Sequence, residues 1–211
     1  MRTLAAVLLA SLAASPAAAQ ELDRGVMDIV RGGTPLGREE FTVQQGTSGS
    51  PSGITIASLV RYPASRPAVQ IQTMLERDPD GAVTALQIDT RQASGLSRVY
   101  GAAVQDHLTI RQTTPSAESV REYPRATGVV ILDDSVFALY GVVAERATAA
   151  GARLPVLFPR TGRRGQITAT RATPTEIDLT GAVTGTLSVD EKGRLTRVVL
   201  ADGMSAIRQN R

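Results

Sequence analysis

The sequence predicts a mainly β protein: an antiparallel meander that forms a curved sheet, or half-open barrel, around a single buried helix. Three observations lead to this fold class. Apolar and polar residues alternate with a period of two along most of the chain, and β-branched residues are frequent. Turn signals made of Gly, Pro, Asp and Ser separate these segments at short intervals. One segment, at about 133–149, is apolar almost all round, which is typical of a helix surrounded by protein.

The composition limits the class of protein. The chain has 211 residues, of which 42% are hydrophobic, enough for one core in a single β-rich domain over residues 20–211. It has no Cys and one His, which excludes disulfides, thiolate metal sites and any site that needs two histidines from one chain. The net charge of +3 and the aromatic content of 3% argue against a nucleic-acid binder, which combines a basic stripe with stacking aromatics. We expect no metal and no cofactor.

The first 19 residues have the pattern of a signal peptide. Arg2 forms a short positive region, residues 4–12 are apolar, and the small residues 17–19 fit a cleavage site. The apolar stretch is too short to span a bilayer. We expect cleavage after Ala19, which leaves a soluble mature chain without a transmembrane segment, exported to a periplasm or out of the cell. Because no Cys follows the signal, a lipoprotein anchor is excluded.

The alternation predicts eight strands before the helix. The clearest boundary is the turn at residues 78–81, Asp-Pro-Asp-Gly, because Pro presets φ and Gly supplies a left-handed conformation. Residues 32–37 form a Gly- and Pro-rich turn cluster, and residues 46–53 a flexible loop. Pro124 fits only the edge or end of a strand, so the last of the eight is an edge strand. The expected strands cover residues 26–31, 38–45, 54–62, 68–77, 82–91, 97–103, 107–113 and 119–125.

The segment at about 133–149 is the single expected helix. Asp133, Asp134 and Ser135 offer N-caps, and the two acids suit the positive end of the helix dipole. Gly151 offers a C-cap. The apolar side chains of the helix are expected either to fill the core or to wall a ligand cavity. The candidates for such an apolar ligand site are Phe137, Leu139, Tyr140 and Val143.

After the helix the β alternation returns. The loop at residues 160–165 carries the densest basic cluster, with two glycines among the arginines. Guanidinium groups bind phosphates and other anions, so Arg160, Arg163 and Arg164 are candidate contacts for an anionic head group, the alternative being a solvated loop. Residues 190–193 form a hairpin turn. The expected strands cover residues 154–158, 166–172, 176–180, 182–190, 194–200 and 204–209.

No catalytic constellation stands out. His107 would need a nucleophile and an orienting acid, but Asp106 adjoins it on a strand, where neighbours point to opposite faces. The serines at residues 46–50 have no strand-turn-helix context. We therefore expect no catalytic residue and no enzyme activity, and a hydrolase that uses His107 is the least favoured alternative.

Two motifs carry a resemblance to a known group of proteins. Both resemble parts of secreted bacterial β-meander domains of unknown function. Residues 33–43, GTPLGREEFTV, resemble the G-x-x-(I/L)-G-x-x-x-F-x-V pattern at the start of these domains, and residues 185–198 resemble their last hairpin. These domains are similar in architecture to the periplasmic outer-membrane lipoprotein carriers, whose curved sheet covers a helix and shelters acyl chains. The resemblance implies the fold and an apolar ligand, and it carries over no catalytic residue.

Two functions follow as expectations. The first is an exported, non-catalytic protein that binds a lipid or another apolar or amphipathic ligand in the cell envelope. Few aromatics are present, so a pocket lined by Val, Leu, Ile and Ala would suit alkyl chains. The second is a structural or interaction module with a filled core, whose partner is an envelope protein. An apolar cavity between sheet and helix favours the first, and a solid interior favours the second.

Overall fold

The computed structural model describes residues 20–105, 107–124 and 128–209. The expected signal peptide, residues 1–19, lies outside the described residues. Within them the chain forms one 15-stranded sheet and one short helix, α1 (Tyr140–Arg146). The strands are β1 (Glu21–Arg31), β2 (Thr34–Gln45), β3 (Ile54–Tyr62), β4 (Val69–Arg77), β5 (Val83–Gln92), β6 (Gly95–Val104), β7 (His107–Thr113), β8 (Glu118–Pro124), β9 (Val130–Ile131), β10 (Ala152–Phe158), β11 (Arg163–Thr173), β12 (Glu176–Gly181), β13 (Gly185–Val189), β14 (Leu195–Leu200) and β15 (Met204–Arg208).

The first strand lies inside the sheet rather than at its edge. β2 to β8 follow β1 on one side in chain order, and β15 back to β9 follow it on the other side. Neighbouring strands are antiparallel except β9 and β10, which are parallel. β1 and β15 pair directly, with Met27 opposite Arg208 and Arg31 opposite Met204. The predicted antiparallel meander is confirmed, and its two halves join where the first and last strands meet.

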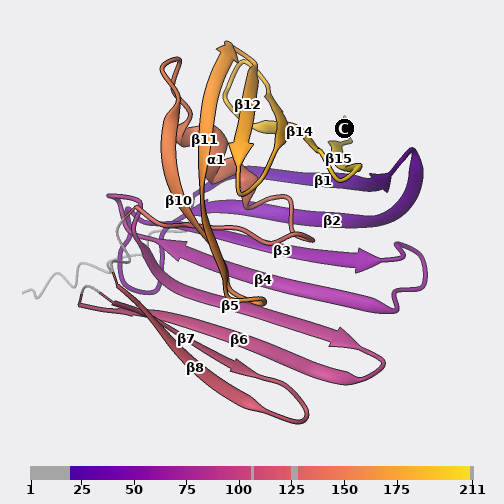
Figure 1. The fold of residues 1–211 in the computed structure, drawn as a ribbon, viewed down its shortest axis with the longest axis vertical. Helices are drawn as coiled ribbons and strands as arrows, with labels where there is room; N and C mark the ends of the chain where they lie inside the picture. The colour runs from indigo at the N-terminus through magenta and orange to yellow at the C-terminus, as the bar shows by residue number, and fades with distance from the viewer. Residues whose placement is uncertain (1–19, 106, 125–127, 210–211) are drawn as a thin grey trace, which may run out of the picture.

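The sheet curves until its halves face each other. Sheets twist, and a sheet of this many strands does not stay flat. In Figure 1, β1 to β8 form a broad curved layer, while β10 to β15 rise beside it and enclose α1. Residues 128–151, before β10, run on the inner side, where residues 130–132, 136–140 and 142–144 are buried. The predicted half-open barrel around a buried segment is thereby confirmed.

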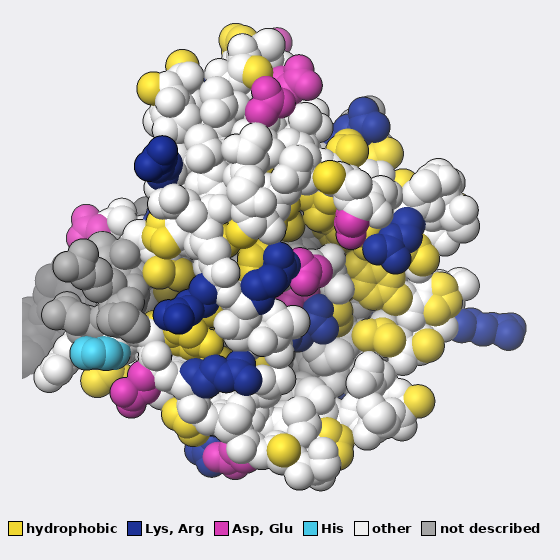
Figure 2. All heavy atoms as spheres, in the orientation of Figure 1, with side chains coloured by type: hydrophobic (Ala, Val, Ile, Leu, Met, Phe, Trp, Pro, Cys, Tyr) yellow, Lys and Arg dark blue, Asp and Glu magenta, His cyan; other side chains and the backbone are white. Residues whose placement is uncertain are grey.

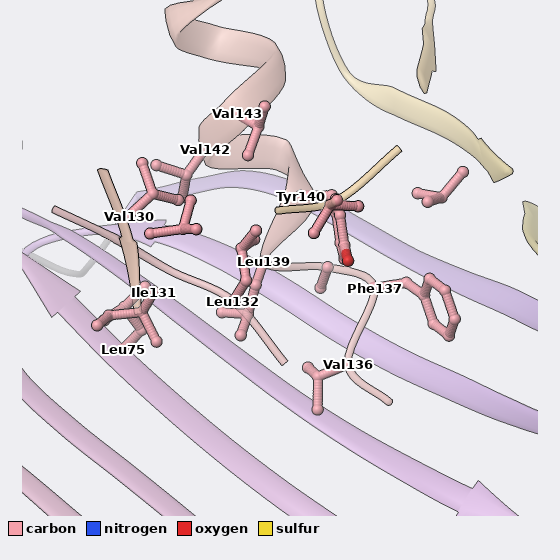
Figure 3. Packing of buried hydrophobic residues seen from close by; sticks show 14 of the residues in the cluster. Leu75, Val130, Ile131, Leu132, Val136, Phe137, Leu139, Tyr140, Val142 and Val143 are labelled. Carbon is pink, nitrogen blue, oxygen red and sulfur yellow. The ribbon is translucent and has the colours of Figure 1, made fainter. Parts of the chain in front are cut away.

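Alternate residues of the strands supply the other wall of the core. Ile71 and Leu75 of β4, and Leu86 and Ile88 of β5, are at most 2% exposed. Figure 3 shows Leu75 among the side chains of the buried segment between β8 and β10. The period-two pattern therefore places one face of each strand against this segment.

The helix is shorter than predicted. α1 spans Tyr140–Arg146 instead of about 133–149, and its N-cap is Leu139, which makes no side-chain capping hydrogen bond. The N-cap role expected for residues 133–135 is therefore wrong, and so is the C-cap role of Gly151, because the chain is already extended at Ala147.

Long-range hydrogen bonds explain this difference. Residues 130–131 pair with β10 as the short strand β9, and the N–H groups of Phe137 and Ala138 donate to the side chain of Glu39 on β2. Backbone groups that a longer helix would satisfy internally are satisfied here by other elements. The sequence around residues 130–138 does not indicate these distant partners, so the helix length could not be predicted from it.

Each strand expected from the sequence is present, with ends shifted by a few residues. β9 was not predicted, because two residues are too few to show alternation. The expected turn cluster at 32–37 is too long, since Gly32 and Gly33, with φ of 54° and 83°, complete the turn and β2 begins at Thr34. Likewise Gly162 ends the turn after β10, so Arg163 and Arg164 belong to β11 rather than to a loop.

Candidate functional site

The four apolar residues singled out in the helical region lie in the packed core. Phe137, Leu139, Tyr140 and Val143 are each 0% exposed, and the rings of Phe137 and Tyr140 stack with centroids 6.2 Å apart (Figure 3). Of the four, Tyr140 also borders an open hollow of about 480 Å³. At these positions the chain's own side chains occupy the space between sheet and helix. A ligand site has to be sought at the margins of the half-barrel.

Glu39 is a buried carboxylate that the sequence did not single out. It is 0% exposed on the inner face of β2. Ser58 Oγ donates to its Oε1 at 2.7 Å, Phe137 N–H donates to its Oε2 at 2.8 Å, and Ala138 N–H lies 3.2 Å from both oxygens. The N–H groups of Phe137 and Ala138 belong to the turn that enters α1. Glu39 thus supplies the acceptor that this helix start lacks.

Burial controls the protonation of this carboxyl. Desolvation raises the pKa of Glu39 to about 7, against the hydrogen bonds from Ser58, Ala138 and Phe137, which lower it. The nearby charge of Asp133 adds to the rise. A buried acid with a pKa near neutrality is a candidate functional group on general grounds. Here its contacts are all to the protein's own backbone and to Ser58, which indicates a role in holding the buried segment in place.

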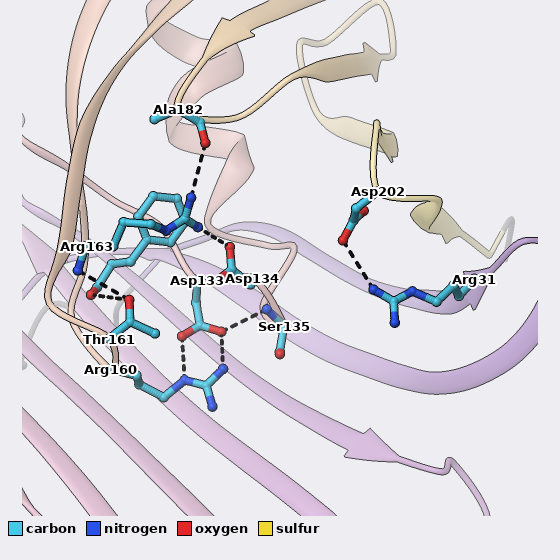
Figure 4. A network of polar contacts seen from close by, with 10 residues as sticks. Arg31, Asp133, Asp134, Ser135, Arg160, Thr161, Arg163, Ala182 and Asp202 are labelled. Carbon is cyan, nitrogen blue, oxygen red and sulfur yellow. Dashed lines mark hydrogen bonds and ion pairs between the residues drawn. The ribbon is translucent and has the colours of Figure 1, made fainter.

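A second buried carboxylate holds one of the predicted head-group arginines. Asp133 is 3% exposed, and Arg160 donates to it through Nε and Nη2, each at 2.6 Å (Figure 4). Asp133 also accepts the N–H of Ser135, whose carbonyl accepts the hydroxyl of Tyr62 at 2.9 Å. Burial alone would lower the pKa of Arg160, but its bonds to Asp133 and the charges around it raise that pKa. Arg160 is therefore neutralised by a fixed partner.

Arg163 also has an ion-pair partner, although this pair is exposed, with the side chains of Arg163 and Asp134 42% and 55% accessible. Its Nη2 donates to Asp134 at 2.5 Å, its Nη1 donates to the carbonyl of Ala182, and its guanidinium carbon lies 3.6 Å from the centroid of the Phe158 ring (Figure 4). A hollow of about 460 Å³ opens beside this network. Its arginines, Arg31 and Arg160, are both ion-paired. An anion there would have to compete with carboxylates already in place.

Arg164 differs from its two neighbours. Among the described residues, no carboxylate oxygen lies within 4.0 Å of its guanidinium nitrogens. The residue is exposed on β11, opposite Leu157 of β10. Its guanidinium carbon lies 5.7 Å from the ring centroid of Tyr123 on β8. Of the three predicted head-group arginines, Arg164 is the one whose charge has no such partner within the described residues.

The strands around Arg164 form a seam where the sheet does not close. β8 is the edge strand on one side of the sheet. On the other side the edge strand is the two-residue β9, which pairs with β10 of the β10–β11 hairpin. Gln112 Nε2 on β7 donates to the carbonyl of Arg160 at 3.1 Å, so the two margins lie close together without forming a β ladder. Figure 2 shows dark-blue Lys and Arg side chains interleaved with yellow apolar ones on the face in view.

A hollow of about 440 Å³ lies at this seam, and we call it the seam hollow. Most of its wall is apolar, and Arg164 is the charged residue among those that line it. The side chains that define it are Tyr123, Val129, Pro155, Val156, Leu157 and Arg164. Its volume falls within the range of small-molecule sites, about 300–1,000 Å³.

Two further polar groups lie at the seam. Tyr123 is 8% exposed, and its hydroxyl oxygen is buried without a hydrogen-bond partner in the part of the chain that the structure describes. A buried hydroxyl of this kind usually finds a partner. Arg121, also on β8, packs over Gly162, two residues before Arg164. The seam therefore joins an apolar wall, a hydroxyl and two guanidinium groups.

The outer face of the sheet carries a separate feature. Met74, Tyr100 and Val120 are 37%, 40% and 57% exposed. The strand registers place them in one line across β4 to β8, with Gln87 and Arg111 between them. We call these three residues the outer stripe. Beside it lies an open hollow of about 510 Å³, lined partly by Met74.

The remaining sequence features take no part in these sites. His107 is exposed at the first residue of β7, and Asp106 lies outside the described residues. The Asp78–Gly81 segment forms the predicted turn between β4 and β5, with φ of 80° at Gly81. In the described ranges, no helix has the length and apolar character needed to cross a membrane.

Two solved structures are similar to this fold. One is described as a DUF1089 family protein from Pseudomonas aeruginosa, with 15% identity, a TM-score of 0.50, and coverage of 74% of this chain and 86% of that chain. The other is described as a beta-barrel-like protein of domain of unknown function DUF1849 from Brucella abortus, with 11% identity, a TM-score of 0.55, and coverage of 89% and 95%. No family model matches the sequence. No curated protein matches it either.

At these identities the likeness shows the fold alone. The resemblance to β-rich domains of unknown function is confirmed at that level. The resemblance to lipoprotein carriers stays a prediction.

Proposed function

We propose that this protein is an exported, non-catalytic binding protein of the cell envelope that takes an apolar or amphipathic ligand in the seam hollow. The observation that carries the proposal is the combination of an apolar wall, a buried hydroxyl without a partner among the described residues, and Arg164, at the margin where the two ends of the sheet face each other. Sites of this kind have mostly apolar linings with a few convergent polar groups. Export is supported by the signal-peptide pattern of residues 1–19.

The packed core argues for the margin rather than the interior. A ligand between sheet and helix would have to displace side chains such as Phe137 and Leu139, which are 0% exposed. Loss of the packing of one large apolar side chain in a core lowers the free energy of unfolding by roughly 2–5 kcal/mol. The seam hollow is open already, so binding there leaves the core unchanged.

The experiment is native mass spectrometry of the mature protein purified from a cell-envelope fraction, followed by binding of a fluorescent fatty acid. We expect a copurifying apolar molecule and saturable uptake. Val129→Trp should obstruct the seam hollow and reduce uptake at least about tenfold, because the bulkier side chain narrows the space along the apolar wall. The matched control is Val120→Trp on β8, whose side chain is on the outer face. Equal uptake by the two variants, or none by the parent, would contradict the proposal.

A second function is favoured by the packed core and the outer stripe. A structural or interaction module of the envelope needs no cavity, and the stripe offers exposed apolar side chains for a protein partner. The same purification separates the two functions. A stable protein partner, found without any bound small molecule, would favour the interaction module.

A further inference from the structure

The charge at the seam narrows the class of ligand. The guanidinium groups of Arg160 and Arg163 are bound to Asp133 and Asp134, whereas Arg164 has no carboxylate within 4.0 Å among the described residues. A guanidinium group next to an apolar wall favours a ligand that presents an anion at one end. A neutral apolar ligand would leave this charge without a partner.

Two hydrogen-bond donors belong to residues that line the seam hollow, the Arg164 guanidinium and the buried Tyr123 hydroxyl. Arg164 lies with its guanidinium carbon 5.7 Å from the Tyr123 ring centroid, and the Tyr123 hydroxyl has no partner in the described chain. A carboxylate offers two acceptor oxygens and can take a guanidinium donor on one and a hydroxyl donor on the other. A hydroxyl that is buried and unpaired gains most from such a ligand, because its desolvation is already complete.

The size of the seam hollow limits the apolar part. Its volume of about 440 Å³ lies toward the lower end of the usual range for ligand sites. Val129, Val156 and Leu157 form an aliphatic wall, and the ring of Tyr123, which also lines the hollow, has the Arg164 guanidinium over it. The space accommodates one alkyl chain, and a second chain of a membrane lipid would remain in water.

We infer that the seam hollow binds a single-chain carboxylate, with the chain along Val129, Val156 and Leu157 and the carboxylate held by Arg164 and Tyr123. This inference rests on the proposed function and goes further by naming the ligand class and the two groups that select it. Arg121, which packs over Gly162 in the adjacent turn, adds positive potential without being assigned a direct contact.

The test is calorimetric titration of the mature protein with sodium decanoate and, separately, with decan-1-ol. The parent should bind decanoate about tenfold more tightly than decan-1-ol, the size expected for one charge-assisted hydrogen-bonded pair. Arg164→Gln should remove this preference and leave decan-1-ol binding unchanged. Arg164→Lys should keep part of the preference, since it keeps the charge. Tyr123→Phe should weaken decanoate binding several-fold.

The matched control is Arg163→Gln, the neighbouring position on β11, which should leave the preference for decanoate intact. Circular dichroism of each variant checks that it is folded. Equal affinities of the parent for decanoate and decan-1-ol would overturn the carboxylate inference and leave the proposed function standing. Binding of neither ligand would overturn both. Cosedimentation with phosphatidylglycerol vesicles, in place of decanoate binding, would also overturn the inference, because it would indicate a membrane surface as the ligand.

Discussion

Glu39, Asp133 and Arg160 show how single polar residues position the chain inside the half-barrel. Glu39 accepts hydrogen bonds from residues almost one hundred positions away, and Asp133 accepts hydrogen bonds from Nε and Nη2 of Arg160. Buried polar groups are costly unless they are paired, so each of these pairs favours one position of the segment before α1. At the seam hollow, by contrast, the Arg164 guanidinium has no carboxylate within 4.0 Å and the buried Tyr123 hydroxyl has no hydrogen-bond partner among the described residues.

The raised pKa of Glu39 predicts a pH dependence of stability. In the unfolded chain its pKa is near 4.5, and in the folded protein it is about 7. Between these pH values the folded state binds more protons than the unfolded state, so the free energy of unfolding falls as pH rises. The loss is complete above the folded pKa and is on the order of 3 kcal/mol.

The measurement is urea unfolding of the parent and of Glu39→Gln between pH 4.5 and 8. Other carboxyl groups contribute to both proteins, so the quantity of interest is the difference between them. That difference should change with pH, with the parent losing stability relative to the variant as pH rises. Glu40→Gln, a change at the exposed neighbouring residue, should show no such trend. A difference for Glu39→Gln that is constant with pH would disprove this role.

At the scale of elements, α1 is a short helix kept in place by its surroundings. Its seven residues are fewer than an isolated helix needs to be stable in water. Four of them, Tyr140, Val142, Val143 and Ala144, are buried. Arg171 Nη2 donates to the carbonyl of Ala144 at 2.7 Å, which supplies a donor near the C-terminal end. Tertiary contacts therefore stabilise this helix more than its own propensity does.

Gly141 gives a measure of what backbone propensity contributes to α1. It lies in α1, and a Cβ atom added there would meet nothing within 4 Å. Gly141→Ala should therefore raise the free energy of unfolding by about 0.5–1 kcal/mol, because Ala loses less backbone entropy in a helix. Gly181→Ala is the contrasting change, since Gly181 has φ of 104° and its added Cβ would touch the carbonyl of Gln166. Thermal unfolding should show stabilisation in the first and destabilisation in the second, and the same sign in both would contradict the argument.

At the scale of the whole molecule, the pairing of β1 with β15 joins the two halves of the sheet. Arg208 binds Asp23 through two bonds of 2.6 and 2.9 Å, and the two side chains are 14% and 12% exposed. The same guanidinium lies 5.4 Å from the Phe41 ring centroid on β2. These contacts connect three strands at the junction of the halves.

Removing this pair should weaken the entire fold. Arg208→Ala should lower the free energy of unfolding by about 2–3 kcal/mol, because it leaves a mostly buried carboxylate unpaired. Arg194→Ala removes the more exposed pair with Asp190 in the β13–β14 turn and should cost less than about 1 kcal/mol. Urea unfolding followed by circular dichroism compares the two. An equal decrease in the free energy of unfolding for both variants would show that the Arg208–Asp23 pair at the β1–β15 junction contributes no more to stability than an exposed ion pair.

Much of the fold could be predicted because its signals are local. Alternation and β-branched residues identified the strands, and Asp-Pro-Asp-Gly identified the turn at 78–81. The helix length could not be predicted, because Glu39 and β10 compete for the backbone groups before α1. For the candidate site, the basic cluster was found from its composition. Nothing in the cluster distinguishes Arg164 from Arg160, since their partners lie on other elements.

By itself, the sequence determined the β-rich class, the meander and the presence of one apolar segment to be enclosed, since period, turn residues and hydrophobicity act over a few neighbours. Only the tertiary structure decided that this segment fills the core, which arginines are neutralised, and that a hollow remains at the seam. Those outcomes depend on side chains that meet across large sequence separations, such as Asp133 with Arg160 and Tyr123 with Arg164. Burial makes such pairings energetically decisive, and burial exists only once the sheet has curved around the segment.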